Sequence, residues 1–273
     1  MPAAAISGKT TMPPSMQTDS GVSSAPGLKV VSKRRIHCVL TGKGGVGKTF
    51  AAWCLIQYLR DRGVPTEAVD TDPVNRSLQG FVALKARPVA MLLADNVSLN
   101  VKEIDRLAET IFTTDADFVI DNGAASFLPF GSYLSDTDFA DLADQQGREL
   151  VIHAIVAGGS SMAPTILGLD AIFRGFPQAV RVVVWLNGYF GPLELEGKTF
   201  DAMPIYLDNA KRIQGTVQLP ELSAFGFRPN VQDMLGRHLT FEEALTSPTF
   251  MLAEKQRLTM VRRTIWQQLD AAL

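Results

Sequence analysis

One short segment constrains this chain of 273 residues more than any other, the glycine-rich stretch GKGGVGKT from Gly42 to Thr49. It stands between the apolar run IHCVL, which predicts a strand, and a pattern from Thr49 to Gly63 that predicts a helix. In that context the backbone N–H groups of a glycine loop converge on phosphate oxygens at the start of the helix. The spacing G-x-x-x-x-G-K-[ST] therefore predicts a phosphate-binding loop. The predicted nucleotide contacts are Gly42, Lys43, Gly44, Gly45, Val46, Gly47, Lys48, Thr49 and Phe50.

The same letters also satisfy the dinucleotide-binding pattern G-x-G-x-x-G. Asp70 ends the next predicted strand about twenty residues later, where an acid that binds a ribose would stand. Lys48 and Thr49 favour a nucleoside triphosphate instead. NAD needs neither a lysine at this place nor a hydroxyl for magnesium, whereas a triphosphate uses both.

Apolar runs alternate with helix-length segments along the rest of the chain. Strands are predicted in TEAVD, FVID, LVIHAIVA, VRVVVWLN and TVQLP, and helices in VKEIDRLAETIF and SMAPTILGLDAIFRGF. Near-continuous Val and Ile runs are typical of strands buried on both faces. The predicted fold is α/β, with the doubly wound, mostly parallel sheet of a P-loop NTPase over residues 35–273. Residues 1–34 are predicted to form a flexible arm, because their Ala, Ser, Thr and Pro offer little to bury.

Composition narrows the classes of protein. With 46% hydrophobic residues, 20% charged residues and a net charge of -2, the chain is neither globally disordered nor a polycation made for nucleic acid. Its two cysteines form no metal or disulfide pattern, and no apolar run reaches the roughly 18 residues of a membrane span. A cytoplasmic location is expected. The basic trio Lys33, Arg34 and Arg35 could touch phosphates or anionic lipid, but solvated side chains are the simpler interpretation.

Acidic residues follow two of the predicted strands. Asp70 and Asp72 lie in DTDPVN, at a strand end that faces the nucleotide crevice of an open α/β sheet. An Asp-Pro turn is the plainer interpretation of Asp72. Asp121 ends FVID and is predicted to be the Walker B acid, which holds a magnesium-bound water. The predicted magnesium ligands are therefore Thr49, Asp70, Asp72 and Asp121.

Lys43, directly after the first glycine, makes the loop resemble that of the deviant Walker A (ParA/MinD-like) ATPases, which include plasmid-partition and cell-division-site ATPases. The resemblance implies that Lys43 reaches across an ATP-dependent homodimer to the partner's phosphates, where charge develops during transfer. It also gives Asp72 the role of orienting the attacking water, and it places Asp70 in the outer shell of the site. Lys43, Lys48 and Asp72 are the catalytic residues predicted on this basis.

The resemblance also implies a site for the base. Asn187, at the end of VVVWLN, would hydrogen-bond the base, and Pro220 and Glu221 in QLPE would line its other side. An asparagine amide has donors and an acceptor that suit adenine. Because Gly188 and Tyr189 follow in place of N-K-x-D, ATP is favoured over GTP, with Mg2+ as its companion.

The segments VIDNGAASF and WLNGYFGP, with EGKTF soon after, are more specific, and they resemble nucleotide-binding conjugal transfer proteins of broad-host-range plasmids. That likeness implies a slowly hydrolysing dimeric switch that recruits or positions other conjugal transfer proteins. The chain departs from the general family after Asp121, where Asn122, Gly123 and Ala124 replace an early proline, so the second switch is expected to move differently. A partition ATPase that binds DNA nonspecifically and a non-hydrolysing adaptor remain the alternatives.

The C-terminal segment from Pro248 to Leu273 predicts an amphipathic helix, whose stripe of Leu258, Val261, Ile265 and Leu269 is expected to dock on the sheet. Its Lys255, Arg257, Arg262 and Arg263 leave nonspecific DNA or peripheral membrane contact open. No histidine has metal-binding spacing, and His153, inside an apolar run, is predicted to be a hydrogen-bonded core residue. Ser160 and Ser161 are predicted to cap a helix. The aromatic loop from Trp185 to Phe200 fits a partner-binding loop and a capped core equally well.

Overall fold

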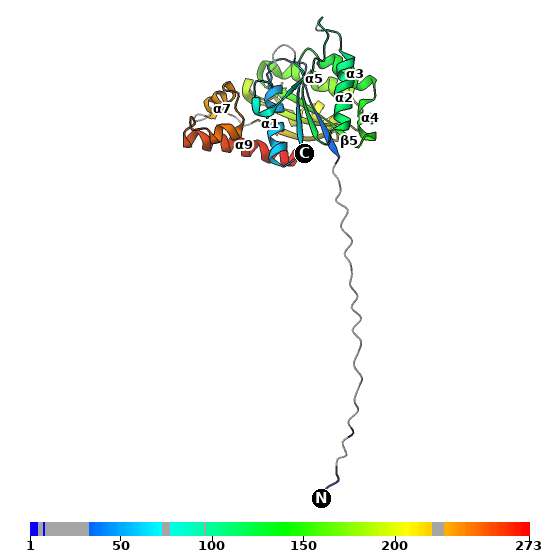
Figure 1. The fold of residues 1–273 in the computed structure, drawn as a ribbon, viewed down its shortest axis with the longest axis vertical. Coiled ribbons are helices and arrows are strands. Elements are labelled where there is room, and N and C mark those ends of the chain that lie inside the picture. The colour runs from blue at the N-terminus through cyan, green and yellow to red at the C-terminus, as the bar shows by residue number, and fades with distance from the viewer. Residues whose placement is uncertain (5–7, 9–32, 73–76, 96, 220–226) are drawn as a thin grey trace. The chain divides into compact units, whose positions relative to one another are not determined.

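The computed structural model describes residues 1–4, 8, 33–72, 77–95, 97–219 and 227–273. Contacts divide the chain into two units, Met1–Ser32 and Lys33–Leu273. The helices and strands described here belong to the second unit (Figure 1). The strands are β1 (Arg34–Leu40), β2 (Thr66–Asp70), β3 (Arg87–Pro88), β4 (Asp117–Asp121), β5 (Arg148–Ala157), β6 (Arg181–Asn187), β7 (Glu194–Leu195), β8 (Lys198–Thr199) and β9 (Ile213–Gln218). The α-helices are α1 (Lys48–Asp61), α2 (Val101–Thr113), α3 (Phe127–Asp136), α4 (Phe139–Gln145), α5 (Met162–Gly175), α6 (Pro204–Asn209), α7 (Phe227–Gly236), α8 (Phe241–Thr246) and α9 (Leu252–Ala272), and short 3-10 turns are η1 (Val82–Leu84), η2 (Gly159–Ser161), η3 (Gly188–Phe190) and η4 (Phe200–Ala202).

The main sheet has seven strands in the order β3-β2-β4-β1-β5-β6-β9, and every neighbouring pair is parallel. The remaining strands, β7 and β8, form a separate antiparallel pair. The chain winds outward in both directions from β1, so right-handed crossovers place helices on both faces. This confirms the predicted doubly wound α/β fold. In such sheets ligands bind beyond the carboxyl ends of the strands, at the point where the winding reverses.

Two apolar cores cover the two faces of the sheet. One is built by α1, α7, α8 and α9 against side chains that include Val39, Val119 and Trp185. The other lies under α2, α3, α4 and α5, against the alternate side chains of the same strands, such as Ile36 and Ile120. Because side chains alternate across a strand, buried runs such as IHCVL feed both cores at once.

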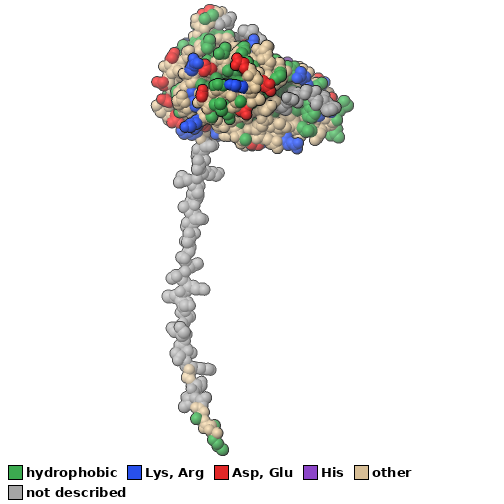
Figure 2. Space-filling model, turned by 180° about the vertical axis from the view of Figure 1, so that it is seen from behind, with side chains coloured by type: hydrophobic (Ala, Val, Ile, Leu, Met, Phe, Trp, Pro, Cys, Tyr) green, Lys and Arg blue, Asp and Glu red, His purple; other side chains and the backbone are tan. Residues whose placement is uncertain are grey.

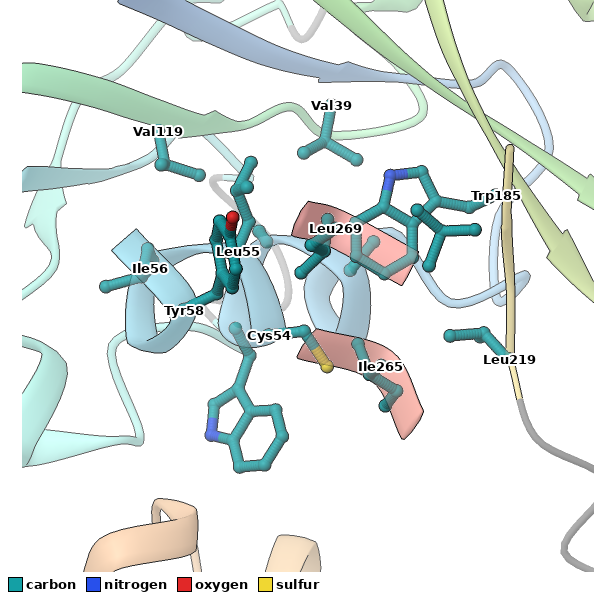
Figure 3. Close-up of a cluster of buried hydrophobic side chains, with 14 of the residues drawn as sticks. Val39, Cys54, Leu55, Ile56, Tyr58, Val119, Trp185, Leu219, Ile265 and Leu269 are labelled. Atoms are coloured by element: carbon teal, nitrogen blue, oxygen red, sulfur yellow. The ribbon is translucent and has the colours of Figure 1, made fainter. Parts of the chain in front are cut away.

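Helix α9 docks on the sheet, as its apolar stripe predicts. Leu258, Val261, Ile265 and Leu269 are each at most 3% exposed, and Figure 3 shows Ile265 beside Cys54 of α1, with Leu269 in the same cluster. The stripe is therefore used inside the protein, and it is not presented to a lipid surface. Among the described residues, no helix is both long and apolar enough to cross a membrane.

Two local predictions differ from the structure. The helix expected from Thr49 to Gly63 runs from Lys48 to Asp61, since Gly63 has a left-handed φ of 72° and its N–H turns back to the carbonyl of Arg60. Ser160 and Ser161, predicted to cap a helix, both lie in the turn η2. Ser161 occupies the N-cap of α5 as predicted, but its side chain makes no capping hydrogen bond, and Ser160 lies outside the cap.

The basic trio before β1 forms ion pairs. Lys33 pairs with Asp144 on α4, Arg34 with Asp115 (2.7 Å) and Arg35 with Glu149 (3.1 Å). These residues lie at the amino end of β1, whereas the phosphate-loop motif follows its carboxyl end. The trio is therefore placed away from the predicted phosphate site, and its partners are carboxylates of the same chain.

Two fully buried histidines share a hydrogen bond in the middle of the sheet. His37 Nδ1 and His153 Nε2 are 2.9 Å apart, and the indole N–H of Trp185 donates to His153 Nδ1 at 3.0 Å. His153 must then carry its proton on Nε2 and donate to His37. This confirms His153 as a hydrogen-bonded core residue and identifies His37 as its partner. Burial lowers the pKa of both imidazoles; for His37 the carboxylate of Asp117, 3.8 Å from Nε2, acts in the opposite direction.

We expect this pair to make the fold acid-sensitive. The imidazoles gain protons below about pH 6.5 in the unfolded chain but stay neutral when folded, so the unfolded state binds more protons there. The free energy of unfolding should fall below that pH by up to about 1.4 kcal/mol per pH unit for each histidine, and the raised pKa of Asp121, about 7, should offset about one of the two contributions. Urea unfolding followed by circular dichroism between about pH 5 and 7.5 measures this. The exposed His238 provides a control, since His238→Asn should keep the same slope; a flat profile in the wild type would contradict the expectation.

Candidate functional site

The phosphate-loop segment joins β1 to α1 at the carboxyl edge of the sheet. Its backbone is left-handed at Gly45 (φ 72°) and Gly47 (φ 105°), which favours glycine at both positions. Val46 between them is 1% exposed and anchors the loop in the core. The carbonyl of Gly47 accepts the N–H of Ala51 at 3.0 Å and so begins α1. The loop therefore ends on a helix N-terminus, where free N–H groups favour an anion.

Two glycines of the loop are also required by close neighbours. A Cβ atom at Gly42 would lie 2.9 Å from Cδ1 of Phe127, the first residue of α3. A Cβ atom at Gly47 would lie 2.9 Å from Nδ2 of Asn187, at the end of β6. The loop is thus packed between residues from both halves of the sheet, which fixes its position over the strand ends.

Lys48 lies inside this loop. Its ammonium group donates to the carbonyl of Lys43 at 3.0 Å, and the residue is 8% exposed. Burial lowers the pKa of Lys48, while the carboxylates of Asp121 and Asp72 act in the opposite direction. The structure thus brings three of the predicted site residues into electrostatic range of one another. Lys43 itself is exposed at the surface of the loop.

Asp121 ends β4, close to Thr49 in the first turn of α1. Burial raises the pKa of Asp121 to about 7, and the nearby Thr49 hydroxyl acts in the opposite direction. The aspartate is 3% exposed. A hydroxyl and a carboxylate therefore stand side by side directly behind the loop.

Asp70 occupies the position across from Asp121, because the two residues are partners in the parallel pairing of β2 and β4. Its carboxylate accepts backbone N–H groups of Asp72 at 3.1 Å, Leu78 at 3.1 Å and Gln79 at 3.2 Å. Burial raises the pKa of Asp70, and these three bonds oppose the rise. Asp70 thus organises the chain that follows β2, a role that sequence reasoning missed, and its binding of magnesium stays a prediction.

Asp72 is half-buried beside the segment that follows β4. A Cβ atom at Gly123 would lie 3.2 Å from Cα of Asp72, so only a residue without a side chain fits this approach comfortably. The residue before Gly123, Asn122, is held by side-chain hydrogen bonds. Its Oδ1 accepts the hydroxyls of Thr71 at 3.2 Å and Ser126 at 2.9 Å.

A pocket of about 310 Å3 opens beside the loop. Asn187 lies in its wall, and its amide is engaged by the protein: Nδ2 donates to the carbonyl of Val46 at 2.9 Å, and Oδ1 accepts the N–H of Tyr189 at 3.0 Å. Pro220 and Glu221, predicted to line the base, lie outside the described residues. The pocket is lined by Gly45, Gly47, Phe50, Asn187, Gly188, Tyr189, Phe190, Leu219, Arg228, Val231, Gln232, Leu235 and Val261.

The far wall of this pocket comes from α7 and was not predicted. The guanidinium of Arg228 lies 4.4 Å from the ring centroid of Tyr189, and Gln232 Nε2 donates to the Tyr189 hydroxyl at 3.2 Å. The helix has no motif that would identify it, so the only sequence signal was the aromatic loop. Tyr189 and Phe190 of that loop face the pocket, although both are more than 40% exposed.

Glycines hold the aromatic loop in place. A Cβ atom at Gly158 would lie 2.1 Å from the carbonyl oxygen of Gly191, and one at Gly159 would lie 2.4 Å from that of Phe190. The N–H of Gly159 donates to the carbonyl of Pro192 at 3.0 Å. The chain after β5 and the chain after β6 therefore meet backbone to backbone, which fixes one wall of the pocket.

Substitution of Gly158 tests this contact. Gly158→Ala forces the two backbones apart and should lower the free energy of unfolding by about 2–3 kcal/mol. Gly188→Ala is the matched control, because its nearest neighbour is the tip of Leu193 at 3.8 Å, an ordinary contact, and it should cost less than about 1 kcal/mol. Chemical unfolding of the three proteins measures both values. Equal stability of the two variants would refute the contact.

The donors fit magnesium that arrives with a nucleotide. Within the described ranges, no group of three or more His, Cys, Asp or Glu residues could hold a metal ion. Mg2+ bound with a nucleotide takes most of its ligands from phosphate oxygens and water, and only one or two from the protein. The adjoining Thr49 hydroxyl and Asp121 carboxylate suit that requirement.

This fold and this loop define a class of protein, the P-loop nucleotide-binding proteins. Residues 37–221 match the family model described as the CobQ/CobB/MinD/ParA nucleotide binding domain. The chain belongs to this family, and the predicted resemblance to the deviant Walker A ATPases is confirmed.

The more specific resemblance is confirmed by relatives from Escherichia coli. Two proteins named Protein TraL are 41% and 37% identical to this chain over 238 residues, which cover 87% of this chain and 98% of each relative. The chromosome-partitioning ATPase Soj of Treponema pallidum is 28% identical over 178 residues, 63% of this chain and 62% of Soj. Among solved structures, MinD in the MinC:MinD cell division complex of Aquifex aeolicus has a TM-score of 0.48 at 14% identity, over 84% of this chain and 94% of that one.

Proposed function

We propose that this chain binds Mg-ATP, dimerises around it, hydrolyses it slowly, and serves plasmid conjugal transfer in the cytoplasm by recruiting or positioning other transfer proteins. The observation that carries the proposal is the cluster of Lys48, Thr49 and Asp121 around a glycine loop at the start of α1. The link to conjugation rests on the relatives named TraL. A partition ATPase would explain the cluster but not the likeness to the relatives named TraL, and an NAD enzyme would explain neither.

Each residue of the cluster has a distinct task in this proposal. The glycine loop presents N–H groups to the phosphates, and Lys48 exchanges its bond to the Lys43 carbonyl for phosphate oxygens. Thr49 and Asp121 hold Mg2+, which neutralises charge on the phosphates when it is bound. Asp72 orients the attacking water, a positioning role that needs no strong basicity. The exposed Lys43 reaches the phosphates of a second copy.

The pocket beside Asn187 takes the base. Its volume and mostly apolar wall suit a planar ring that is flanked by Phe50, Leu219 and Val231. The Asn187 amide has a second N–H and a second lone pair beyond its bonds to Val46 and Tyr189. Those free positions match the donor and acceptor of adenine's edge.

Nucleotide binding is tested by Lys48→Ala. Loss of a charge-assisted contact to phosphate should weaken binding of a fluorescent ATP analogue by about tenfold to a hundredfold. Lys102→Ala removes an exposed lysine from α2 and should leave the affinity unchanged. Fluorescence titration of the three proteins decides the point. Wild-type affinity in the Lys48 variant, or competition by NAD as strong as by ATP, would remove the proposal.

The dimeric switch is tested by light scattering after size exclusion. Asp72→Ala should trap the ATP-bound dimer, because its hydrolysis is impaired, and should run as a monomer with Mg-ADP. Lys43→Ala in the same background should bind ATP yet stay monomeric. Phosphate release should fall in the Asp72 variant.

A monomer with every nucleotide would contradict the switch, and tight nucleotide retention without turnover would favour the adaptor. ATP-dependent, salt-sensitive retention on nonspecific DNA would favour the partition alternative.

A further inference from the structure

A second hollow lies on the opposite face of the sheet from the base pocket, between α2, α3 and α4. Its volume is about 450 Å3, within the range of roughly 300–1000 Å3 that ligand pockets occupy. The ten residues that line this acidic groove are Asp105, Ala108, Glu109, Phe112, Thr113, Tyr133, Thr137, Phe139, Leu142 and Gln146. They share no residue with the base pocket.

The floor of the acidic groove is apolar. The rings of Phe112 and Phe139 stack with centroids 5.8 Å apart. Leu142 on α4 is 40% exposed beside them, and Ala108 on α2 is half-buried. Phe139 is only 6% exposed, so the apolar surface that a partner could reach here comes mainly from Leu142 and the half-buried Phe112.

The rim carries negative charge. Asp105 and Glu109 line the acidic groove, and Asp136, Asp138 and Asp141 are exposed on the adjoining ends of α3 and α4. In the described parts of the chain, none of these five carboxylates forms an ion pair. Residues 101–147 contain ten acidic residues and two basic ones. Figure 2, seen from behind, has the α2–α4 side of this unit on its left, where acidic side chains (red) lie along the margin.

Charge complementarity therefore selects the occupant. The five unpaired carboxylates repel anionic lipid and acidic peptides, and they attract Lys and Arg. No basic residue lines the acidic groove. An amphipathic helix laid in a groove supplies apolar anchors on one face and charges at its edges, which is the pattern that this surface complements.

We propose that the acidic groove between α2, α3 and α4 binds a cationic amphipathic segment of a partner protein. Its apolar side chains contact Phe112, Phe139 and Leu142, and a Lys or Arg residue pairs with Glu109, which lines the acidic groove. Asp105 is already engaged, since it accepts the hydroxyl of Tyr133 at 2.9 Å. This surface is separate from the nucleotide site, so the proposal stands without the function proposed above.

The probe is a synthetic helical peptide that repeats LKKLLKL, titrated into the full-length protein without nucleotide. Its counterpart, which repeats LEELLEL, is the charge control. Binding is measured by fluorescence anisotropy of the labelled peptide, and Leu and Ala methyl NMR spectra locate it. We expect the Leu142 and Ala108 methyl signals to shift while that of Leu167, exposed on α5, does not. The affinity should fall at least about tenfold when salt rises from about 50 to about 500 mM.

Matched variants separate the acidic groove from general attraction to an acidic protein. Ala108→Arg fills the floor and should weaken binding at least about tenfold, whereas Ala253→Arg adds the same side chain at an exposed site on α9 and should weaken it less than about twofold. Glu109→Gln should weaken binding about threefold or more, and Glu242→Gln on α8 should not. Circular dichroism checks that each variant is folded.

Three results would overturn the proposal. Equal binding by the Ala108 and Ala253 variants would mean that the peptide binds elsewhere. Equal binding of the LEELLEL peptide would remove the charge argument. Self-association of the protein without peptide, abolished by Ala108→Arg, would assign the acidic groove to a second copy of this chain instead.

Discussion

The close approach of the Thr49 hydroxyl to the Asp121 carboxylate brings the first turn of α1 to the end of β4. It follows from the parallel pairing of β1 and β4, which sets Val39 beside Asp121, so the chain that leaves β1 passes over the end of β4. The same register sets Asp70 beside Asp121. The phosphate loop between these elements has little freedom, because Lys48 and Val46 are buried and the loop joins β1 directly to α1. The candidate site is thus a consequence of strand order.

Much of this could be predicted from sequence because the signals are local. The strand, glycine loop and helix around Gly42–Thr49 are adjacent in the chain, and runs of Val and Ile predict the buried strands. Asp121 was predicted for the same reason, since it ends such a run at the edge where ligands bind, whereas the role of Asn187 was implied by the family resemblance. The apolar stripe of α9 was local too, and its period of 3.6 residues fixed which side is buried.

What could not be predicted depends on residues that are distant in sequence. Nothing near His37 indicates that His153 will lie 2.9 Å away, because that contact exists only once β1 and β5 pair. Arg228 joins the pocket beside Asn187 through Tyr189, although α7 carries no motif. Asp70 was predicted to be a magnesium ligand, but the backbone N–H groups that its carboxylate accepts belong to residues up to nine positions later. In each case the contact is made by a residue that only the tertiary structure brings close.

The segment after β4 shows how the departure from the family pattern is accommodated. Asn122 accepts hydroxyl groups from Thr71 and Ser126, so it joins the end of β2 to the start of α3 without the rigidity of a proline ring. Gly123 lies against Asp72, and Phe127 lies against Gly42. A displacement of the Asp72 segment must therefore be taken up by Gly123 and by the first turn of α3. Because Tyr133 of α3 and Thr137 at its C-cap line the acidic groove, this one helix runs from the phosphate loop to the surface between α2, α3 and α4.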